Sequence, residues 1–113
     1  MTVTIYHNPR CSKSRQALAL LEERGIKPTI IEYLKNPPTA EELTAILKKL
    51  GRKPADILRP KDAQEAGIDP AGMSDAALIK KIVEHPIVIE RPIVVSGNKA
   101  ALGRPPESVL SIL

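Results

Sequence analysis

The sequence predicts an α/β fold in which a small mixed sheet carries a helical insertion between its second and third strands. Two short β-branched stretches, at residues 3–6 and 29–33, flank a segment whose apolar residues recur at helical spacing. This pattern indicates a β-α-β unit with parallel strands and a right-handed crossover. Near the end of the chain, residues 90–95 and 99–102 predict two further strands, which a tight turn joins as a hairpin.

The turn after the first strand determines where the single cysteine lies. Asn8-Pro9 is a turn signal, because proline fixes its own φ and biases the residue before it away from helix. Apolar residues at helical spacing then predict a helix over residues 12–24. We therefore expect Cys11 at or just before the first turn of this helix, directly after a strand.

The central region predicts helices of different lengths. Thr39 and Glu42 form the capping-box signature of a helix with one apolar face, which Gly51 ends. The prolines that follow leave room only for short helical turns, at residues 55–58 and 62–66.

The remaining elements complete the predicted architecture. Ser74 predicts the N-cap of another helix, which His85-Pro86 ends, and residues 106–113 predict a closing helix after the hairpin. Parallel first strands, a late hairpin and a final helix are typical of a thioredoxin-like α/β sheet with a helical insertion. The length fits a single domain that spans residues 1–113.

Composition narrows the classes of partner and compartment. The chain of 113 residues has one cysteine, so an internal disulfide is impossible and nothing argues for an oxidising compartment. It contains no apolar run long enough to span a membrane and no signal-peptide pattern. A net charge of +4 from scattered cations, with two aromatic side chains, suits small anions better than nucleic acid. We expect a cytoplasmic monomer that binds neither nucleic acid nor membrane.

The surroundings of Cys11 favour chemistry over an inert role in the core. A helix N-terminus presents unpaired N–H groups and partial positive charge, which favour a thiolate and bind oxyanions. Three cations, Arg10, Lys13 and Arg15, crowd this end of the predicted helix, where acidic residues would be more stable. The alternative is a small, buried, unreactive cysteine. The polar neighbours favour an anion-receptive thiolate site.

Five blocks of the sequence, which together cover nearly the whole chain, resemble the glutaredoxin-linked, ArsC-type arsenate reductases in order and spacing. Within that family, the runs CSKS and GRPP are similar to the YfgD-like subgroup. The blocks are YHNPRCSKSR at residues 6–15, YLKNPP at 33–38, LR at 58–59, RPIVV at 91–95 and GRP at 103–105.

The resemblance implies one nucleophile and three oxyanion-binding residues. Cys11 corresponds to the family's catalytic cysteine, and Arg59, Arg91 and Arg104 correspond to its three arginines. A guanidinium group suits this role because its planar fork donates paired hydrogen bonds to tetrahedral oxyanions and stays protonated. The alternative for each arginine is a solvated surface charge. All three are followed by proline, at chain breaks where site residues tend to gather.

The resemblance also implies three supporting residues, His7, Arg15 and Pro92, and the Cys-x-x-Ser spacing from Cys11 adds Ser14. His7 corresponds to a histidine that, when charged, would favour the thiolate; the alternative is a structural turn residue. The Ser14 hydroxyl would donate to the thiolate, or else help to satisfy the first helical turn. Arg15 would anchor the loop. Pro92 is similar to the proline that follows a cis peptide in thioredoxin-like folds.

The activity that the resemblance implies is reduction of arsenate to arsenite, with arsenate or a similar oxyanion bound at the site. The chain has no second cysteine, so glutathione as co-substrate and glutaredoxin would supply the resolving thiols. No bound cofactor is implied, and one cysteine with two histidines does not form a metal-ligand set.

Two alternatives remain at this stage. One is a regulator of the Spx type that binds RNA polymerase, but Ser14 replaces the second cysteine of that subfamily's Cys-x-x-Cys. The other is a glutathione-dependent thiol enzyme of the same fold with a different substrate. Departures near Cys11 bear on the latter, since Arg10 replaces a small residue and Ser12-Lys13 replaces the Gly-Thr common in the family's arsenate reductases.

Overall fold

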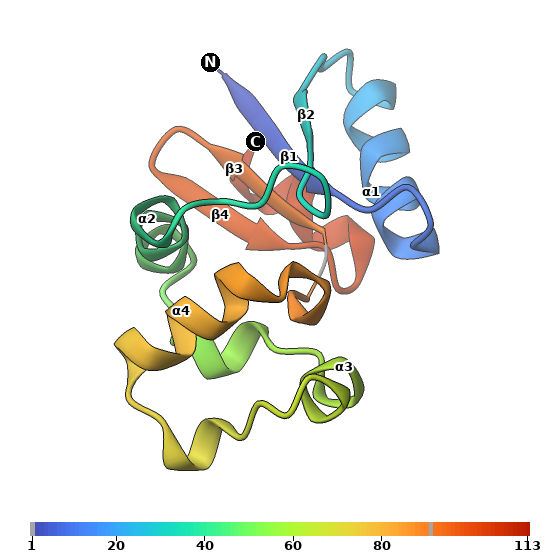
Figure 1. The fold of residues 1–113 in the computed structure, drawn as a ribbon. Coiled ribbons are helices and arrows are strands. Elements are labelled where there is room, and N and C mark those ends of the chain that lie inside the picture. The colour runs from blue at the N-terminus through green and yellow to red at the C-terminus, as the bar shows by residue number, and fades with distance from the viewer. Residues whose placement is uncertain (1, 91) are drawn as a thin grey trace. The chain divides into compact units, whose positions relative to one another are not determined.

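The computed structural model describes residues 2–90 and 92–113, which form two compact units. Among the described residues, the sheet unit comprises 2–36 and 92–113, and the helical unit comprises Pro37–Glu90. The helical unit is thus the insertion that the sequence predicts between the second and third strands (Figure 1). The expectation of a single domain stays a prediction.

The sheet unit contains four strands in the order β2-β1-β3-β4. Strands β1 and β2 are parallel, whereas β1 pairs antiparallel with β3, and β3 with β4. The predicted parallel pair and the predicted hairpin are both confirmed, as is the thioredoxin-like α/β fold. The strands are β1 (Val3–His7), β2 (Thr29–Glu32), β3 (Ile93–Ser96) and β4 (Lys99–Leu102).

Strand β3 is shorter than the predicted strand over residues 90–95, and the backbone hydrogen bonds give the reason. The Glu90 N–H donates to the Ile57 carbonyl at 2.6 Å, within the helical unit. Pro92 has no N–H to donate to a neighbouring strand. The ladder with β1 and β4 therefore begins at Ile93.

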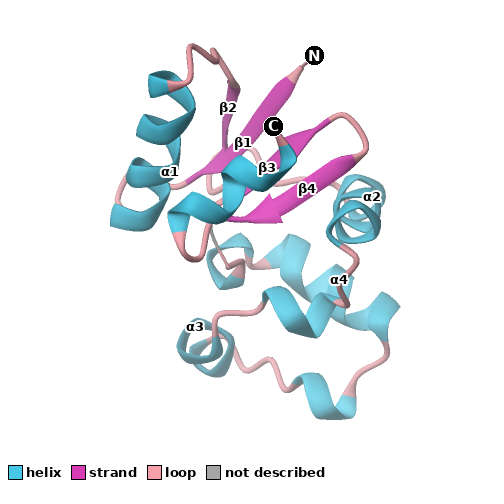
Figure 2. Cartoon of the chain, turned by 180° about the vertical axis from the view of Figure 1, so that it is seen from behind, coloured by secondary structure: helices cyan, strands magenta, loops and turns pink. Residues whose placement is uncertain are grey.

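One face of the sheet is covered by α1 (Ser12–Glu23) and by η4 (Pro106–Ile112) at the C-terminus (Figure 2). The closing helix lies where the sequence predicts it, but it is a 3₁₀ helix rather than an α-helix. The wholly aliphatic core between these helices and the sheet contains Val3, Ile5, Ala17, Leu21, Val94 and Val109.

The helical unit contains three α-helices and three 3₁₀ helices, and four of the six begin with proline. Proline suits the first helical position because the N–H that it lacks would have no acceptor within the helix. The six elements are α2 (Ala40–Leu50), η1 (Pro54–Ile57), α3 (Pro60–Glu65), η2 (Pro70–Gly72), α4 (Asp75–Glu84) and η3 (Pro86–Val88).

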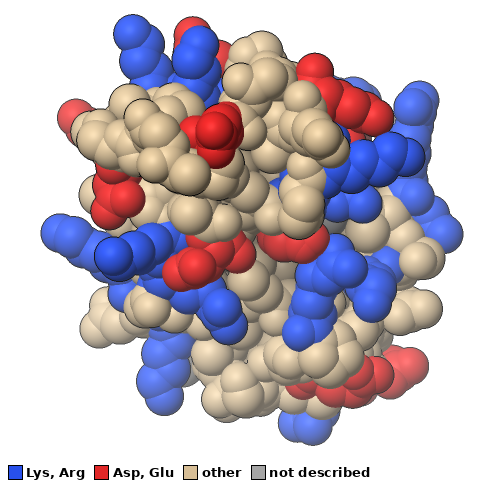
Figure 3. Space-filling model, turned by 90° about the horizontal axis from the view of Figure 1, so that it is seen from below, with Lys and Arg blue, Asp and Glu red and all other residues tan. Residues whose placement is uncertain are grey.

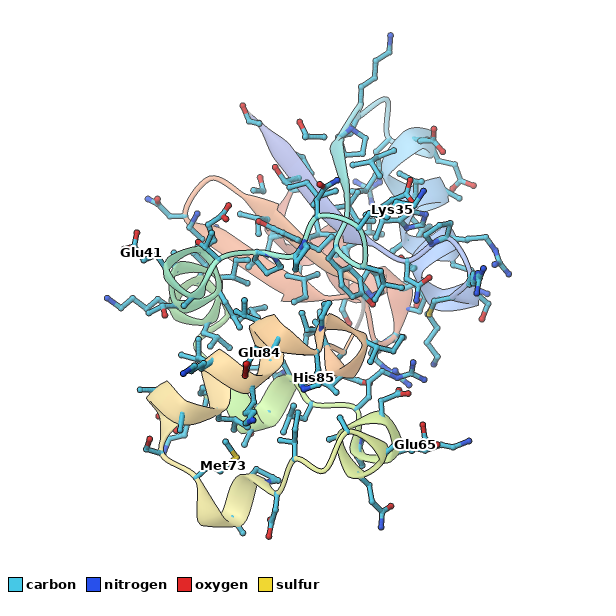
Figure 4. The ribbon with its side chains drawn as sticks, in the orientation of Figure 1. Lys35, Glu41, Glu65, Met73, Glu84 and His85 are labelled. Carbon is cyan, nitrogen blue, oxygen red and sulfur yellow. The ribbon has the colours of Figure 1, made fainter. Side chains whose placement is uncertain are left out.

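The caps of α2 and α4 confirm the predicted helix boundaries. Thr39 Oγ1 accepts a hydrogen bond from the Glu42 N–H at 3.2 Å, and Glu42 Oε1 accepts one from the Thr39 N–H at 3.0 Å. Gly51 ends α2 in the left-handed conformation. Ser74 Oγ accepts from the Ala77 N–H at 3.2 Å to cap α4, which ends just before His85 (Figure 4).

Charged side chains of both signs share the face drawn in Figure 3, where Lys and Arg are interspersed with Asp and Glu. Over residues 2–90 and 92–113, none of the helices has the length and apolar character that crossing a membrane requires.

Candidate active site

Asn8 organises the loop that connects β1 to α1. Its carbonyl accepts a hydrogen bond from the Cys11 N–H at 3.0 Å, and its side-chain Oδ1 accepts one from the Arg10 N–H at 3.0 Å. Asn8 is buried, so these bonds satisfy polar atoms that water does not reach. From the sequence, Asn8 is only a turn signal. Its structural role was missed, although an asparagine that bonds to the backbone two residues on is a known turn device.

Cys11 is the N-cap residue of α1, as predicted, and it is partly exposed. Its backbone is extended, and its carbonyl accepts the first helical hydrogen bond, from the Arg15 N–H at 3.0 Å. Its side chain makes no capping hydrogen bond. The N–H groups of the first helical turn have no acceptor within the helix, so they are available to a thiolate or an oxyanion at this end.

Arg15 closes the same loop from the helix side. Its Nη1 donates to the Pro9 carbonyl oxygen at 2.8 Å, which links the first turn of α1 to the segment before Cys11. The guanidinium group therefore spans the loop that carries the thiol. It also brings a positive charge to the N-terminal end of α1.

Ser14 points into the protein, where it contacts the residues that precede the loop. It is fully buried, and its Oγ accepts from the Asn8 N–H at 3.1 Å and lies 2.6 Å from Nδ1 of His7. The hydroxyl has only one proton to donate. If His7 Nδ1 is unprotonated, this proton goes to the ring. If Nδ1 carries a proton, the ring donates to Oγ and the hydroxyl proton is available to another acceptor.

The surroundings of His7 lower its pKa below the ordinary value of 6.5, mainly because burial disfavours the charged ring. The nearby carboxylate of Glu32 raises the pKa, and the Arg15 guanidinium lowers it further. The imidazole is therefore neutral at neutral pH. The role predicted for a charged His7 stays a prediction, and the hydrogen bond to Ser14 is the contact through which a neutral ring would act.

Pro92 and Arg104 are connected through Gly103. The Gly103 N–H donates to the Pro92 carbonyl at 2.8 Å, and a Cβ at Gly103 would lie 2.5 Å from Pro92 Cγ. Only glycine fits this approach without a shift of the proline ring. Arg104 comes next in the chain, is exposed, and precedes a cis peptide bond to Pro105.

The other two predicted oxyanion-binding arginines are Arg59 and Arg91. Arg59 belongs to the helical unit, where it is the N-cap residue of α3 and lies close to two carboxylates, those of Asp62 and Glu90. Arg91 lies outside the described residues, as does the peptide bond for which the resemblance implies a cis geometry. Sequence reasoning did not single out either carboxylate.

The structure thus gathers four of the predicted residues in and beside one loop: His7, Cys11, Ser14 and Arg15. Within the described ranges, His, Cys, Asp and Glu side chains do not gather in groups of three or more that could hold a metal ion.

A thioredoxin-like sheet with a partly exposed cysteine at the start of its first helix defines the class of this protein as a thiol protein of that fold. Comparison with known proteins gives the family. The model of the ArsC family matches residues 6–112, and the chain belongs to that family.

Named relatives match all or nearly all of the chain. The chain is 51% identical to an arsenate reductase of Haemophilus influenzae, with 100% of both chains covered. It is 46% identical to the protein YfgD of Escherichia coli, over 98% of this chain and 96% of the relative. The solved structure of an arsenate reductase from Vibrio cholerae matches with a TM-score of 0.94 and 48% identity, covering 100% of this chain and 98% of the other. The family resemblance is confirmed.

Proposed function

We propose that this protein is an arsenate reductase in which Cys11 is the nucleophile and glutathione and glutaredoxin are the external reductants. The observation that carries the proposal is the position of Cys11 as the N-cap of α1, with a side chain that makes no capping hydrogen bond. Relatives named arsenate reductase, one of which is 51% identical to this chain, support the reaction class. We also propose that it acts as a cytoplasmic monomer without a bound cofactor or metal.

In the first step, the Cys11 thiolate attacks the arsenic atom of arsenate. A sulfur–arsenic bond forms, the hydroxyl group of hydrogen arsenate takes up a proton from solvent and leaves as water, and arsenic stays in the +5 state. Negative charge builds up on the arsenate oxygens in this step. The N–H groups of the first turn of α1 stabilise that charge. Arg59, Arg91 and Arg104 bind the remaining oxygens by paired hydrogen bonds.

The later steps need thiols from outside the chain, which has one cysteine. Glutathione attacks the adduct, and glutaredoxin then reduces the mixed species. In total, two thiols are oxidised to one disulfide, arsenic gains the two electrons, and arsenite leaves. The partial exposure of Cys11 is consistent with access by an external thiol.

His7 and Ser14 serve the thiolate in this proposal. The neutral His7 ring donates from Nδ1–H to Ser14 Oγ, which leaves the hydroxyl proton of Ser14 for the sulfur of Cys11. Cys11 and Ser14 occupy the N-cap and third positions of α1, and a side chain at the third position can reach back to the N-cap residue across the first turn. The buried contact between His7 and Ser14 supports this role.

Turnover tests the proposal. NADPH oxidation coupled through glutathione reductase, glutaredoxin and glutathione should depend on arsenate and stop in Cys11→Ser. Leaving out glutathione or glutaredoxin should abolish it as well. Arsenate-independent oxidation, or turnover that survives in Cys11→Ser, would contradict the proposal.

A glutathione-dependent thiol enzyme with another anionic substrate is the second candidate. The observation in its favour is the pair of cations beside Cys11, since the exposed Arg10 and the partly buried Lys13 stand where the family's arsenate reductases have smaller residues. In that case glutathione, but not arsenate, should protect Cys11 from alkylation. The regulatory alternative is weakened, because the buried Ser14 is hydrogen-bonded where that subfamily has its second cysteine.

A further inference from the structure

We infer that Asp62 and Glu90 compete with the oxyanion for the Arg59 guanidinium, and that they thereby limit the affinity of the site for doubly charged anions. This inference rests on the proposed function, because it takes Arg59 to be a substrate-binding residue. The inference gives Asp62 and Glu90 a role in substrate binding, whereas the sequence alone predicts none for them.

Both carboxylates lie within ion-pair distance of Arg59. Asp62 Oδ2 is 3.3 Å from Nη1 of Arg59, and Glu90 Oε1 is 4.0 Å from Nε. The side chains are 32% exposed for Arg59, 21% for Asp62 and 15% for Glu90. Charges that are partly removed from water are screened less by salt than fully exposed ones. These contacts therefore affect the charge that an approaching anion meets.

The backbone fixes the two carboxylates beside Arg59. The Arg59 N–H donates to the Val88 carbonyl at 2.7 Å, and the Glu90 N–H donates to the Ile57 carbonyl at 2.6 Å. An antiparallel bridge between Leu58 and Ile89 lies between these two bonds. Asp62 is held from the other side, because it lies on the first turn of α3, which Arg59 caps. The arrangement is thus built into the helical unit.

The geometry of the guanidinium group explains why the nearby carboxylates compete with an oxyanion for the same N–H groups. A tetrahedral oxyanion binds a guanidinium best through two N–H groups on neighbouring nitrogens. Each such edge of the group includes either Nε, where Glu90 lies, or Nη1, where Asp62 lies. An oxyanion that binds Arg59 by its fork therefore comes close to one of the two carboxylates, which repels it and competes for the same edge. The contact with Glu90 is the weaker of the two, since 4.0 Å exceeds a hydrogen-bond length.

The net charge of Arg59 and the two carboxylates determines how strongly this part of the site attracts an anion. One guanidinium and two carboxylates carry a net charge of about −1 at neutral pH. A dianion is therefore held less tightly than by a bare arginine, in the ground state and before any attack by the thiolate. Weaker ground-state binding keeps unreactive tetrahedral dianions such as phosphate from filling the site, without loss in the chemical step.

Anion binding to the full chain tests the inference. Isothermal titration with phosphate and with arsenate is made in the Cys11→Ser background, where no reaction follows binding. In that background Glu90→Gln and Asp62→Asn remove one negative charge each without loss of shape. Each should tighten binding about two- to fivefold, the range expected for an ion pair at a partly exposed site. In the enzyme with Cys11, Glu90→Gln should lower KM for arsenate and leave kcat unchanged.

Glu84→Gln is the matched control. It removes the same charge from the exposed end of α4, where Glu84 pairs with Lys81 at 3.9 Å (Figure 4). Its dissociation constants should equal those of the parent. Thermal unfolding of each variant verifies folding, and Asp62→Asn carries the test if Glu90→Gln does not fold.

Arg59→Ala separates failure of the inference from failure of the proposed function. If Arg59→Ala weakens anion binding but neither carboxylate variant strengthens it, the competition is wrong and Arg59 keeps its proposed role. Weaker binding in Glu90→Gln and Asp62→Asn would show that the carboxylates only position Arg59, which also overturns the inference. If Arg59→Ala leaves binding unchanged, both fail.

Discussion

The Ser14 hydroxyl oxygen lies 2.6 Å from Nδ1 of His7, and both residues are buried. This contact joins the end of β1 to the first turn of α1, on either side of the loop that carries Cys11. Because the same oxygen accepts from the Asn8 N–H, the orientation of the loop and the hydrogen-bonding state of His7 depend on one side chain.

Ser14→Ala should reduce both stability and thiol reactivity. The change leaves the buried Asn8 N–H and His7 Nδ1 without this partner, at a cost of about 1–3 kcal/mol in the free energy of unfolding. It also removes the proton donor proposed for the thiolate, so iodoacetamide should alkylate Cys11 more slowly at pH 7. Ser12→Ala, on the exposed side of the same turn, is the control. Equal alkylation rates in the two variants would remove Ser14 from the mechanism.

Stability should fall as the pH decreases below about 6.5, the ordinary pKa of histidine. Burial lowers the pKa of His7 in the folded chain, while Glu32 opposes and Arg15 adds to this effect. The unfolded chain therefore binds the proton more readily, and the stabilisation present above pH 6.5 is lost as the pH falls through the folded-state value. Urea unfolding at pH 7.5 and pH 5.5 measures the change.

His7→Gln should make this pH dependence shallower, since the titrating ring is gone. His85→Gln, on the exposed end of α4, is the matched histidine control and should keep the steeper dependence (Figure 4). A steep dependence retained in His7→Gln would mean that other groups cause it.

Gly103→Ala should destabilise the sheet unit and impair turnover. The new Cβ would lie 2.5 Å from Pro92 Cγ, so either the proline ring or the Arg104 loop must move. Overpacking of this kind costs about 1–3 kcal/mol. Gly72→Ala is a suitable control, because a Cβ there meets nothing within 4 Å and the backbone needs no left-handed conformation. Wild-type melting and turnover in Gly103→Ala would contradict the packing argument.

Arg15→Lys should lower kcat/KM while keeping the positive charge. Lysine cannot reproduce the reach of the guanidinium to the Pro9 carbonyl. The loop around Cys11 therefore loses one stabilising hydrogen bond. We expect a loss of about two- to tenfold, which corresponds to the net contribution of about 0.5–1.5 kcal/mol from one hydrogen bond. Arg24→Lys, at the opposite end of α1, should have no effect. An equal effect of the two substitutions would assign the loss to general charge.

Local signals made much of the fold predictable. The capping box of Thr39 and Glu42 and the Ser74 cap lie within four residues of the backbone that they satisfy, so their sequence spacing is sufficient. The parallel pair and the hairpin follow from short connections in the same way. The shortened β3 was not predictable, because the Glu90 N–H bonds to a carbonyl distant in sequence, that of Ile57.

The site was predictable in its centre and less so in its surroundings. Position alone gave Cys11 at the start of a helix, whereas the three arginines came from the family resemblance. The neutral state of His7 depends on burial, and the carboxylates beside Arg59 depend on the bridge between Leu58 and Ile89. Both are products of tertiary packing, which spacing along the chain does not encode.

Protection of Cys11 by arsenate tests the central claim most directly, because it reports oxyanion binding at the thiol itself. The rate of alkylation by iodoacetamide at pH 7 is measured with and without arsenate, in the wild-type chain and in Arg104→Ala. We predict that arsenate slows alkylation of the wild type and that most of this protection is lost in Arg104→Ala. Alkylation that is slowed by glutathione but not by arsenate would contradict the account and assign the site to another substrate.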